Sequence, residues 1–92
     1  MPLTSRERSF LKARAHALEP TVLVGQEGLS DAVLREIERA LTAHELIKVR
    51  AAGEDRDARR ALLDAICART GADAVQHVGK VLVLWRPRPQ EE

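Results

Sequence analysis

The sequence is poor in aromatic residues, with one Phe, one Trp and no Tyr among 92 residues. Stacking platforms for nucleic-acid bases use several aromatic side chains, so a base-stacking surface is nearly excluded. A single cysteine, Cys67, excludes an intrachain disulfide and a zinc site built from several cysteines. The longest strictly apolar run, Val81–Trp85, is far shorter than the roughly 20 residues of a membrane helix.

The N-terminus is basic and polar and has no apolar segment typical of a signal peptide, so we expect a cytoplasmic protein away from membranes. Leu, Val, Ile and Phe supply about a quarter of the chain, more than the roughly one-fifth below which charged chains tend to be disordered. The length supports a single folded domain over residues 1–88, followed by a solvated tail at residues 89–92.

Local signals predict three helices and four strands. The first helix spans residues 4–17 with Thr4 or Ser5 as its N-cap, Ser30 caps the second, and Asp55 and Gly71 bound the third. Strands are expected at residues 21–24, 46–51, 74–78 and 81–86. Gly53 should end the second strand, and a tight turn at Gly79-Lys80 should join the last two.

The resulting order, α-β-α-β-α-β-β, predicts a single α/β domain with a four-stranded mixed sheet. The second and third helices should cover one face, because right-handed crossovers place both on the same side. Segments 22–24 and 81–85 are apolar at every position, which predicts burial of both sheet faces. We therefore place the first helix on the second face.

Helical spacing also predicts which side chains face the core. On the first helix, Phe10, Leu11 and Leu18 fall on one side, and a cationic stripe lies opposite them. That stripe consists of Arg8, Lys12 and His16. On the third helix the predicted apolar stripe comprises Ala58, Ala61, Leu62, Ala65 and Ile66.

Charge is distributed unevenly although the net charge is only +1. Residues 1–18 carry +3, residues 19–73 carry −3, and residues 74–90 carry +3 before the two terminal glutamates. If the fold brings the basic ends together, with Lys80, Arg86 and Arg88 near the first helix, one surface could attract phosphate. A solvated helix face is the alternative for the stripe, and protection of an edge strand is the alternative for Lys48 and Arg50.

The most informative local motif is Gly25-Gln26-Glu27-Gly28, which leaves a strand and opens a helix. Such a turn exposes backbone amides to phosphate, and glycine lets a nucleic-acid backbone approach closely. An ordinary turn that needs glycine for a positive φ is the alternative, and the four residues alone favour it. The carboxylate of Glu27 would repel an approaching phosphate.

Signals for catalysis are weak. His16, His44 and His77 lie in separate elements without ligand-spaced partners, and no nucleophile or phosphate-loop motif is present. Cys67 fits a small half-buried residue, and Trp85 fits packing. We therefore expect neither an enzyme nor a bound cofactor or metal.

These motifs together resemble the CRM domain family (chloroplast RNA splicing and ribosome maturation), in its stand-alone bacterial form typified by YhbY. The resemblance spans roughly residues 3–88, and its segments are residues 11–20, 22–30, 44–49, 53–56, 70–72 and 78–87.

The resemblance implies an RNA-binding domain with a fold similar to the C-terminal domain of translation initiation factor three. It further implies binding to precursor rRNA of the large ribosomal subunit during ribosome assembly. By position, the RNA-contacting loop is Gly25, Gln26, Glu27 and Gly28, and the basic surface uses Arg8, Lys12, Lys48, Arg50 and Lys80.

The sequence thus favours a non-enzymatic, monomeric RNA-binding protein. A protein-binding adaptor that docks on ribosomal proteins through its acidic middle helices stays open as the alternative.

Overall fold

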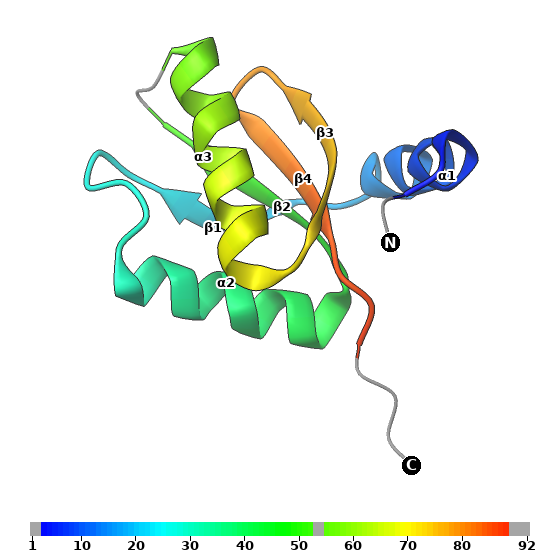
Figure 1. Cartoon of the computed structure of the whole chain (residues 1–92), viewed down its shortest axis with the longest axis horizontal. Coiled ribbons are helices and arrows are strands. Elements are labelled where there is room, and N and C mark those ends of the chain that lie inside the picture. Colours follow the sequence, from blue (N-terminus) through cyan, green and yellow to red (C-terminus); the bar gives the residue numbers. More distant parts are fainter. Residues whose placement is uncertain (1–2, 53–54, 89–92) are drawn as a thin grey trace.

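A computed structural model describes residues 3–52 and 55–88 and confirms the predicted order of helices and strands (Figure 1). The elements are α1 (Ser5–Ala15), β1 (Pro20–Val24), α2 (Asp31–His44), β2 (Leu46–Ala51), α3 (Arg56–Thr70), β3 (Asp73–Val78) and β4 (Val81–Trp85). Every predicted boundary lies within two residues of these. Gly53 and the tail at residues 89–92 lie outside the described residues.

The ends of the helices follow the predicted capping residues. Thr4 and Glu7 form a reciprocal capping box on α1, with Thr4 N donating to Glu7 Oε1 at 2.9 Å, and this amide lowers the pKa of Glu7. The side chains of Ser30 and Asp55 accept amides in the first turns of α2 and α3. Gly71 ends α3 in the left-handed conformation at φ 75°.

The four strands form one mixed sheet in the order β1-β2-β4-β3. β1 and β2 are parallel, and β4 runs antiparallel to both β2 and β3. β2 is therefore a central strand, so edge protection does not explain the charges on it. The register of β3 against β4 shifts between Ala74 and Gln76, which is a β-bulge in an edge strand.

Helices cover the sheet from both sides, as the apolar strands predicted. In Figure 1, α2 and α3 lie together on one side and α1 lies apart from them. Ile37, Leu41, Leu63 and Ile66 pack with the sheet in the larger cluster, and Leu11 belongs to a smaller cluster on the other face. This arrangement confirms the prediction that α1 covers the second face of the sheet.

The predicted inward face of α1 was right for Leu11 but wrong for Phe10 and Leu18. Phe10 is 62% exposed and lies under the guanidinium of Arg14, whereas Leu11 and Ala15 are buried with Leu3. Leu18 is also exposed. The pair Leu11 and Ala15 is one helical turn apart, so it sets the inward side, and Phe10 lies about 100° around the helix from it.

Burial of both faces was also predicted too widely. α1 makes its main contacts with β2, β3 and β4 and not with the outer strand β1. As a result, Leu23 is 58% exposed while its neighbours Val22 and Val24 are buried under the other helices. The stripe predicted for α3 is similarly displaced, because Leu63 is buried and the predicted Ala61 is exposed.

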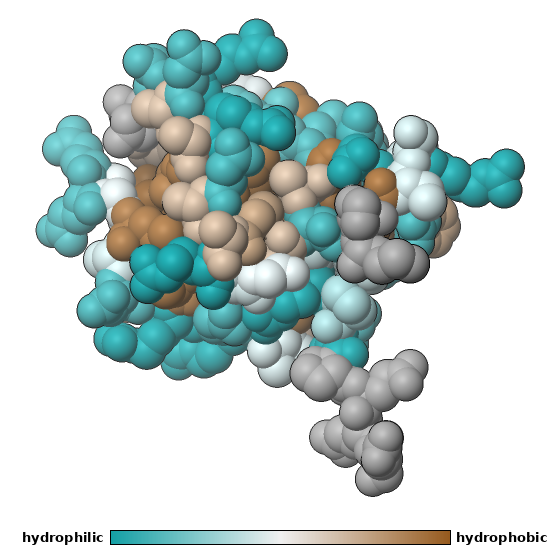
Figure 2. Space-filling model, viewed as in Figure 1, coloured by the Kyte–Doolittle hydropathy of each residue, from teal (hydrophilic) through white to brown (hydrophobic). Residues whose placement is uncertain are grey.

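Apolar residues also reach the outer surface of the two-helix side. Figure 2 shows them gathered over α3 and toward α2, surrounded by hydrophilic groups. Within residues 3–52 and 55–88, no helix is long and apolar enough to cross a membrane.

Candidate nucleic-acid interface

The turn at Gly25–Gly28 connects β1 to α2 and stands out from the body of the protein. Gly25, Gln26 and Glu27 are exposed, and Gly28 N donates to Gly25 O at 3.1 Å to close the turn. The amides of Gln26 and Glu27 donate to no acceptor within the described part of the chain. Two backbone donors of this exposed turn are therefore without a partner among the described residues.

The two glycines of this turn differ in why they are glycine. Gly28 has φ 74°, a left-handed conformation that a side chain disfavours, so local geometry explains it. Gly25 does not have a positive φ, and a Cβ added there would meet no atom within 4 Å. Neither backbone strain nor crowding among the described residues accounts for glycine at position 25.

Hydrogen bonds bring the glycine turn, the end of β2 and the β3–β4 turn to one end of the sheet, which we call the loop end. Ala52 N donates to Val24 O at 3.1 Å, and Ala51 N donates to Lys80 O at 2.8 Å. Arg50 is paired in register with Leu23 on one side and Val81 on the other. The loop end thus unites Gly25–Gly28 with two of the predicted cations, Arg50 and Lys80.

A second group of predicted cations lies beside α1, in a groove of about 240 Å³ that we call the α1 groove. Its lining residues are Lys12, Ala15, His16, Lys48, Gln76, Val78, Val81 and Val83. Lys48 Nζ donates to Leu18 O at 3.0 Å. Lys48 precedes Arg50 by two positions, so both side chains lie on the same sheet face and connect this groove with the loop end.

The cationic stripe of α1 was predicted to point away from the sheet, and this is wrong for Arg8 and Lys12. Arg8 and Lys12 are half-buried at the β3 side, and Arg8 Nε donates to Ala74 O at 3.4 Å. The reason is the position of Leu11, which turns the neighbouring stripe toward the edge of the sheet. A purely solvated helix face therefore does not describe Arg8 and Lys12.

Two C-terminal cations expected near α1 lie elsewhere. Arg86 Nη1 donates to Glu38 Oε2 on α2 at 2.8 Å, and Arg88 Nε lies 3.9 Å from Glu45 Oε2. By contrast, Lys12, Arg50 and Lys80 form no ion pair within residues 3–52 and 55–88. Among the cations predicted to bind RNA, those without an ion pair in the described part of the chain thus lie on α1, β2 and the β3–β4 turn.

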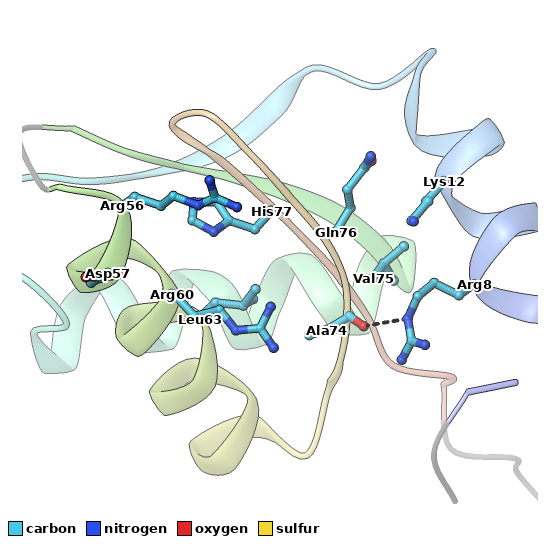
Figure 3. Close-up of a pocket in the computed structure, with 10 residues that line it drawn as sticks. All are labelled: Arg8, Lys12, Arg56, Asp57, Arg60, Leu63, Ala74, Val75, Gln76 and His77. Atoms are coloured by element: carbon cyan, nitrogen blue, oxygen red, sulfur yellow. Dashed lines mark hydrogen bonds between the residues drawn. The ribbon is translucent and has the colours of Figure 1, made fainter. Parts of the chain in front are cut away.

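The sequence did not reveal a larger basic hollow at the edge strand, which we call the β3-edge cleft (Figure 3). It measures about 750 Å³ and is lined by Arg8, Lys12, Arg56, Asp57, Arg60, Leu63, Ala74, Val75, Gln76 and His77. Arg56 and Arg60 belong to the segment that the sequence assigned to an acidic middle. The available signal was their spacing of one helical turn.

The groups considered for chemistry are poorly placed for it. Burial, followed by the nearby carboxylates of Asp64 and Asp73, raises the pKa of the Cys67 thiol to about 11. Cys67 packs against the larger core cluster, as predicted. Among the described residues, no three His, Cys, Asp or Glu side chains gather as a metal site would require.

The fold and these surfaces define a class: a small α/β domain that presents a glycine turn and unpaired cations around an incompletely covered mixed sheet. The chain matches the CRS1 / YhbY (CRM) domain family over residues 3–86. It therefore belongs to the CRM domain family, as its motifs indicated.

Similar proteins carry names that concern RNA. A probable RNA-binding protein of Pseudomonas aeruginosa is 46% identical over 90 residues, which cover 98% of this chain and 86% of that protein. An RNA-binding protein of Haemophilus influenzae is 48% identical over 85 residues, covering 92% and 86% of the two chains.

The solution structure of a hypothetical Staphylococcus aureus protein, described as a candidate RNA-binding protein, has the same fold. Its TM-score is 0.86 at 26% identity, with 98% of this chain and 94% of that chain covered. The expected likeness to the C-terminal domain of translation initiation factor three stays a prediction.

Proposed function

We propose that this protein binds structured precursor rRNA of the large ribosomal subunit during ribosome assembly and acts by binding, not by catalysis. The turn amides at Gln26 and Glu27 hold one phosphate, and nearby cations neutralise others. RNA as the ligand is supported by the names of the relatives. The large-subunit precursor is what the family resemblance implies.

The observation that carries the proposal is Gly25. Nothing among the described residues requires glycine there, yet it stands beside two unused amide donors and near the unpaired Arg50 and Lys80. A missing side chain at an exposed turn permits a bulky anionic chain to approach the amides closely. In this proposal, position 25 is glycine because the RNA backbone approaches the turn there.

The contact area we propose runs from the loop end into the α1 groove and along α1 to Arg8. It comprises Gly25, Gln26, Glu27, Gly28, Arg8, Lys12, Lys48, Arg50 and Lys80. These cations come from three different elements, which suits recognition of RNA by the shape of its backbone. With few aromatic side chains available, sequence readout by base stacking has a minor part.

Salt dependence tests this mechanism. If about five phosphates are neutralised, the slope of log K against log salt is near −3.5 for single-stranded RNA, and affinity falls roughly a hundredfold between 50 and 200 mM salt. Binding would be measured by fluorescence anisotropy with labelled fragments of large-subunit rRNA. A slope near zero would contradict phosphate binding as the main source of affinity.

A second candidate function, docking on ribosomal proteins, is favoured by the apolar atoms over α3 and toward α2 in Figure 2. Gradient sedimentation of cell lysates separates the two. Association with large-subunit precursors that disappears after nuclease treatment supports RNA binding, whereas nuclease-resistant association with ribosomal proteins supports docking.

A further inference from the structure

We infer that the β3-edge cleft is a second binding site for the RNA backbone, in which Arg56 and Arg60 of α3 contact phosphates together with Arg8 and Lys12 of α1. The inference rests on the proposed RNA binding but concerns a surface distinct from the glycine turn. It assigns a role to α3, which the sequence had grouped with the acidic part of the chain.

The cleft has two cationic walls. Arg8 and Lys12 are four residues apart on α1, and Arg56 and Arg60 are four residues apart on α3, so each wall presents two cations one helical turn apart. Figure 3 shows the two pairs on either side of β3. A strand of phosphates running between the walls would meet both pairs.

Little within the described residues neutralises these charges. Arg8, Lys12 and Arg56 form no ion pair among residues 3–52 and 55–88. Arg60 lies 3.5 Å from Asp64, but both side chains are 61% exposed, and such surface pairs contribute little. Asp57, the acidic lining residue, lies away from α1 in Figure 3. Like charges gathered in one hollow favour an anion from outside.

The shape of the cleft favours a nucleic-acid backbone over an added peptide strand. A peptide would have to pair with the outer edge of β3, but a bulge interrupts that strand between Ala74 and Gln76. Arg8 Nε also donates to the carbonyl oxygen of Ala74, which an added strand would need as an acceptor. Arginine forks instead match phosphate oxygens in a bidentate manner, and they need no free strand edge.

The cleft is continuous with the surface already described. Lys12 and Gln76 line both the β3-edge cleft and the α1 groove. Arg56 and His77 also line a hollow that reaches Gly79 in the β3–β4 turn. One RNA can therefore pass from the loop end along α1 and around β3 to α3.

The test compares two double variants with the same change in charge. R56Q/R60Q removes the α3 wall of the cleft, and R35Q/R39Q removes two exposed arginines at the same spacing on α2. With the labelled rRNA fragment, R56Q/R60Q should reduce the magnitude of the salt slope by about 1.4 and weaken binding roughly tenfold at 100 mM salt. R35Q/R39Q should change the slope by less than about 0.3.

The outcomes separate this inference from the proposed function. One outcome is a steep salt slope for the unmodified protein while both double variants change slope and affinity equally. That result overturns the cleft as a binding site but leaves the proposed RNA binding intact. A flat slope for the unmodified protein overturns both. Thermal unfolding checks that each double variant is folded.

A measurement on the unmodified protein gives an independent test. In an amide NMR titration with the same RNA, the resonances of Gln76 and His77 in β3 should shift together with those of the glycine turn. Shifts confined to the turn would overturn the inference.

Discussion

The glycine turn yields the sharpest prediction, because two glycines three residues apart have opposite structural requirements. At Gly28, φ is 74°, so Gly28→Ala forces a side chain into the left-handed region, at a cost of about 1 kcal/mol or more. At Gly25, φ is not positive and a Cβ has open space. Gly25→Ala should therefore leave the free energy of unfolding unchanged or raise it by up to about 1 kcal/mol.

Thermal unfolding followed by circular dichroism measures this difference. In a domain of this size, about 1 kcal/mol corresponds to roughly 4–8 °C in Tm. We expect Gly28→Ala to unfold several degrees below the unmodified protein and Gly25→Ala at or above it. If Gly25→Ala is as destabilising as Gly28→Ala, glycine at position 25 has a structural reason and the proposal loses its main support.

Gly25→Ala should weaken RNA binding although it leaves the stability of the protein intact. A hydrogen bond to a charged group contributes about 1.5–3 kcal/mol, so displacing one phosphate with the methyl group of Gly25→Ala weakens binding roughly tenfold or more. Fluorescence anisotropy at fixed salt reports this change while the protein stays fully folded. Unchanged affinity of a fully folded Gly25→Ala variant would remove the turn from the interface.

Three further predictions concern single residues elsewhere. Glu27→Gln should raise RNA affinity about twofold in low salt, because a carboxylate about 8 Å from phosphate repels it by roughly 0.5 kcal/mol in water, and the gain should disappear in a salt titration at high salt. Arg86→Ala should lower the free energy of unfolding by about 2 kcal/mol in urea titration, since Arg86 bonds Glu38 and the Thr70 carbonyl at 2.8 Å each. With a pKa near 11, Cys67 is only about 0.1% thiolate at pH 8, so iodoacetamide should label the folded protein at least a hundredfold more slowly than the urea-unfolded protein.

Local signals made most of the fold predictable. Thr4, Ser30 and Asp55 each accept amides at a helix start, and Gly71 ends α3 with a left-handed backbone, so these boundaries depend on interactions within a few residues. The order of elements followed from the same local signals, and the placement of α1 followed from strands that are apolar on both faces. Contacts between elements were harder to predict from the sequence, because they depend on where each helix lies on the sheet.

The exposed Phe10 illustrates that limit. Helical spacing predicted that it shares the inward side with Leu11 and Leu18, but only Leu11 of these packs inward, together with Ala15. Since one residue rotates the helix face by about 100°, the same difference decides where Arg8 and Lys12 point. An error in the packing of one apolar residue thus becomes an error in the position of the cations.

The distribution of charge shows why segment sums do not locate a binding surface. The basic C-terminal segment contributes Arg86 and Arg88 to ion pairs with Glu38 of α2 and with Glu45 just after it, so these charges are partly neutralised by the protein itself. The segment that is acidic in sum contributes Arg56 and Arg60 to the β3-edge cleft, beside the cations of α1. A polyanion responds to unpaired cations that share a surface, and the fold creates that set by placing α1 against β3.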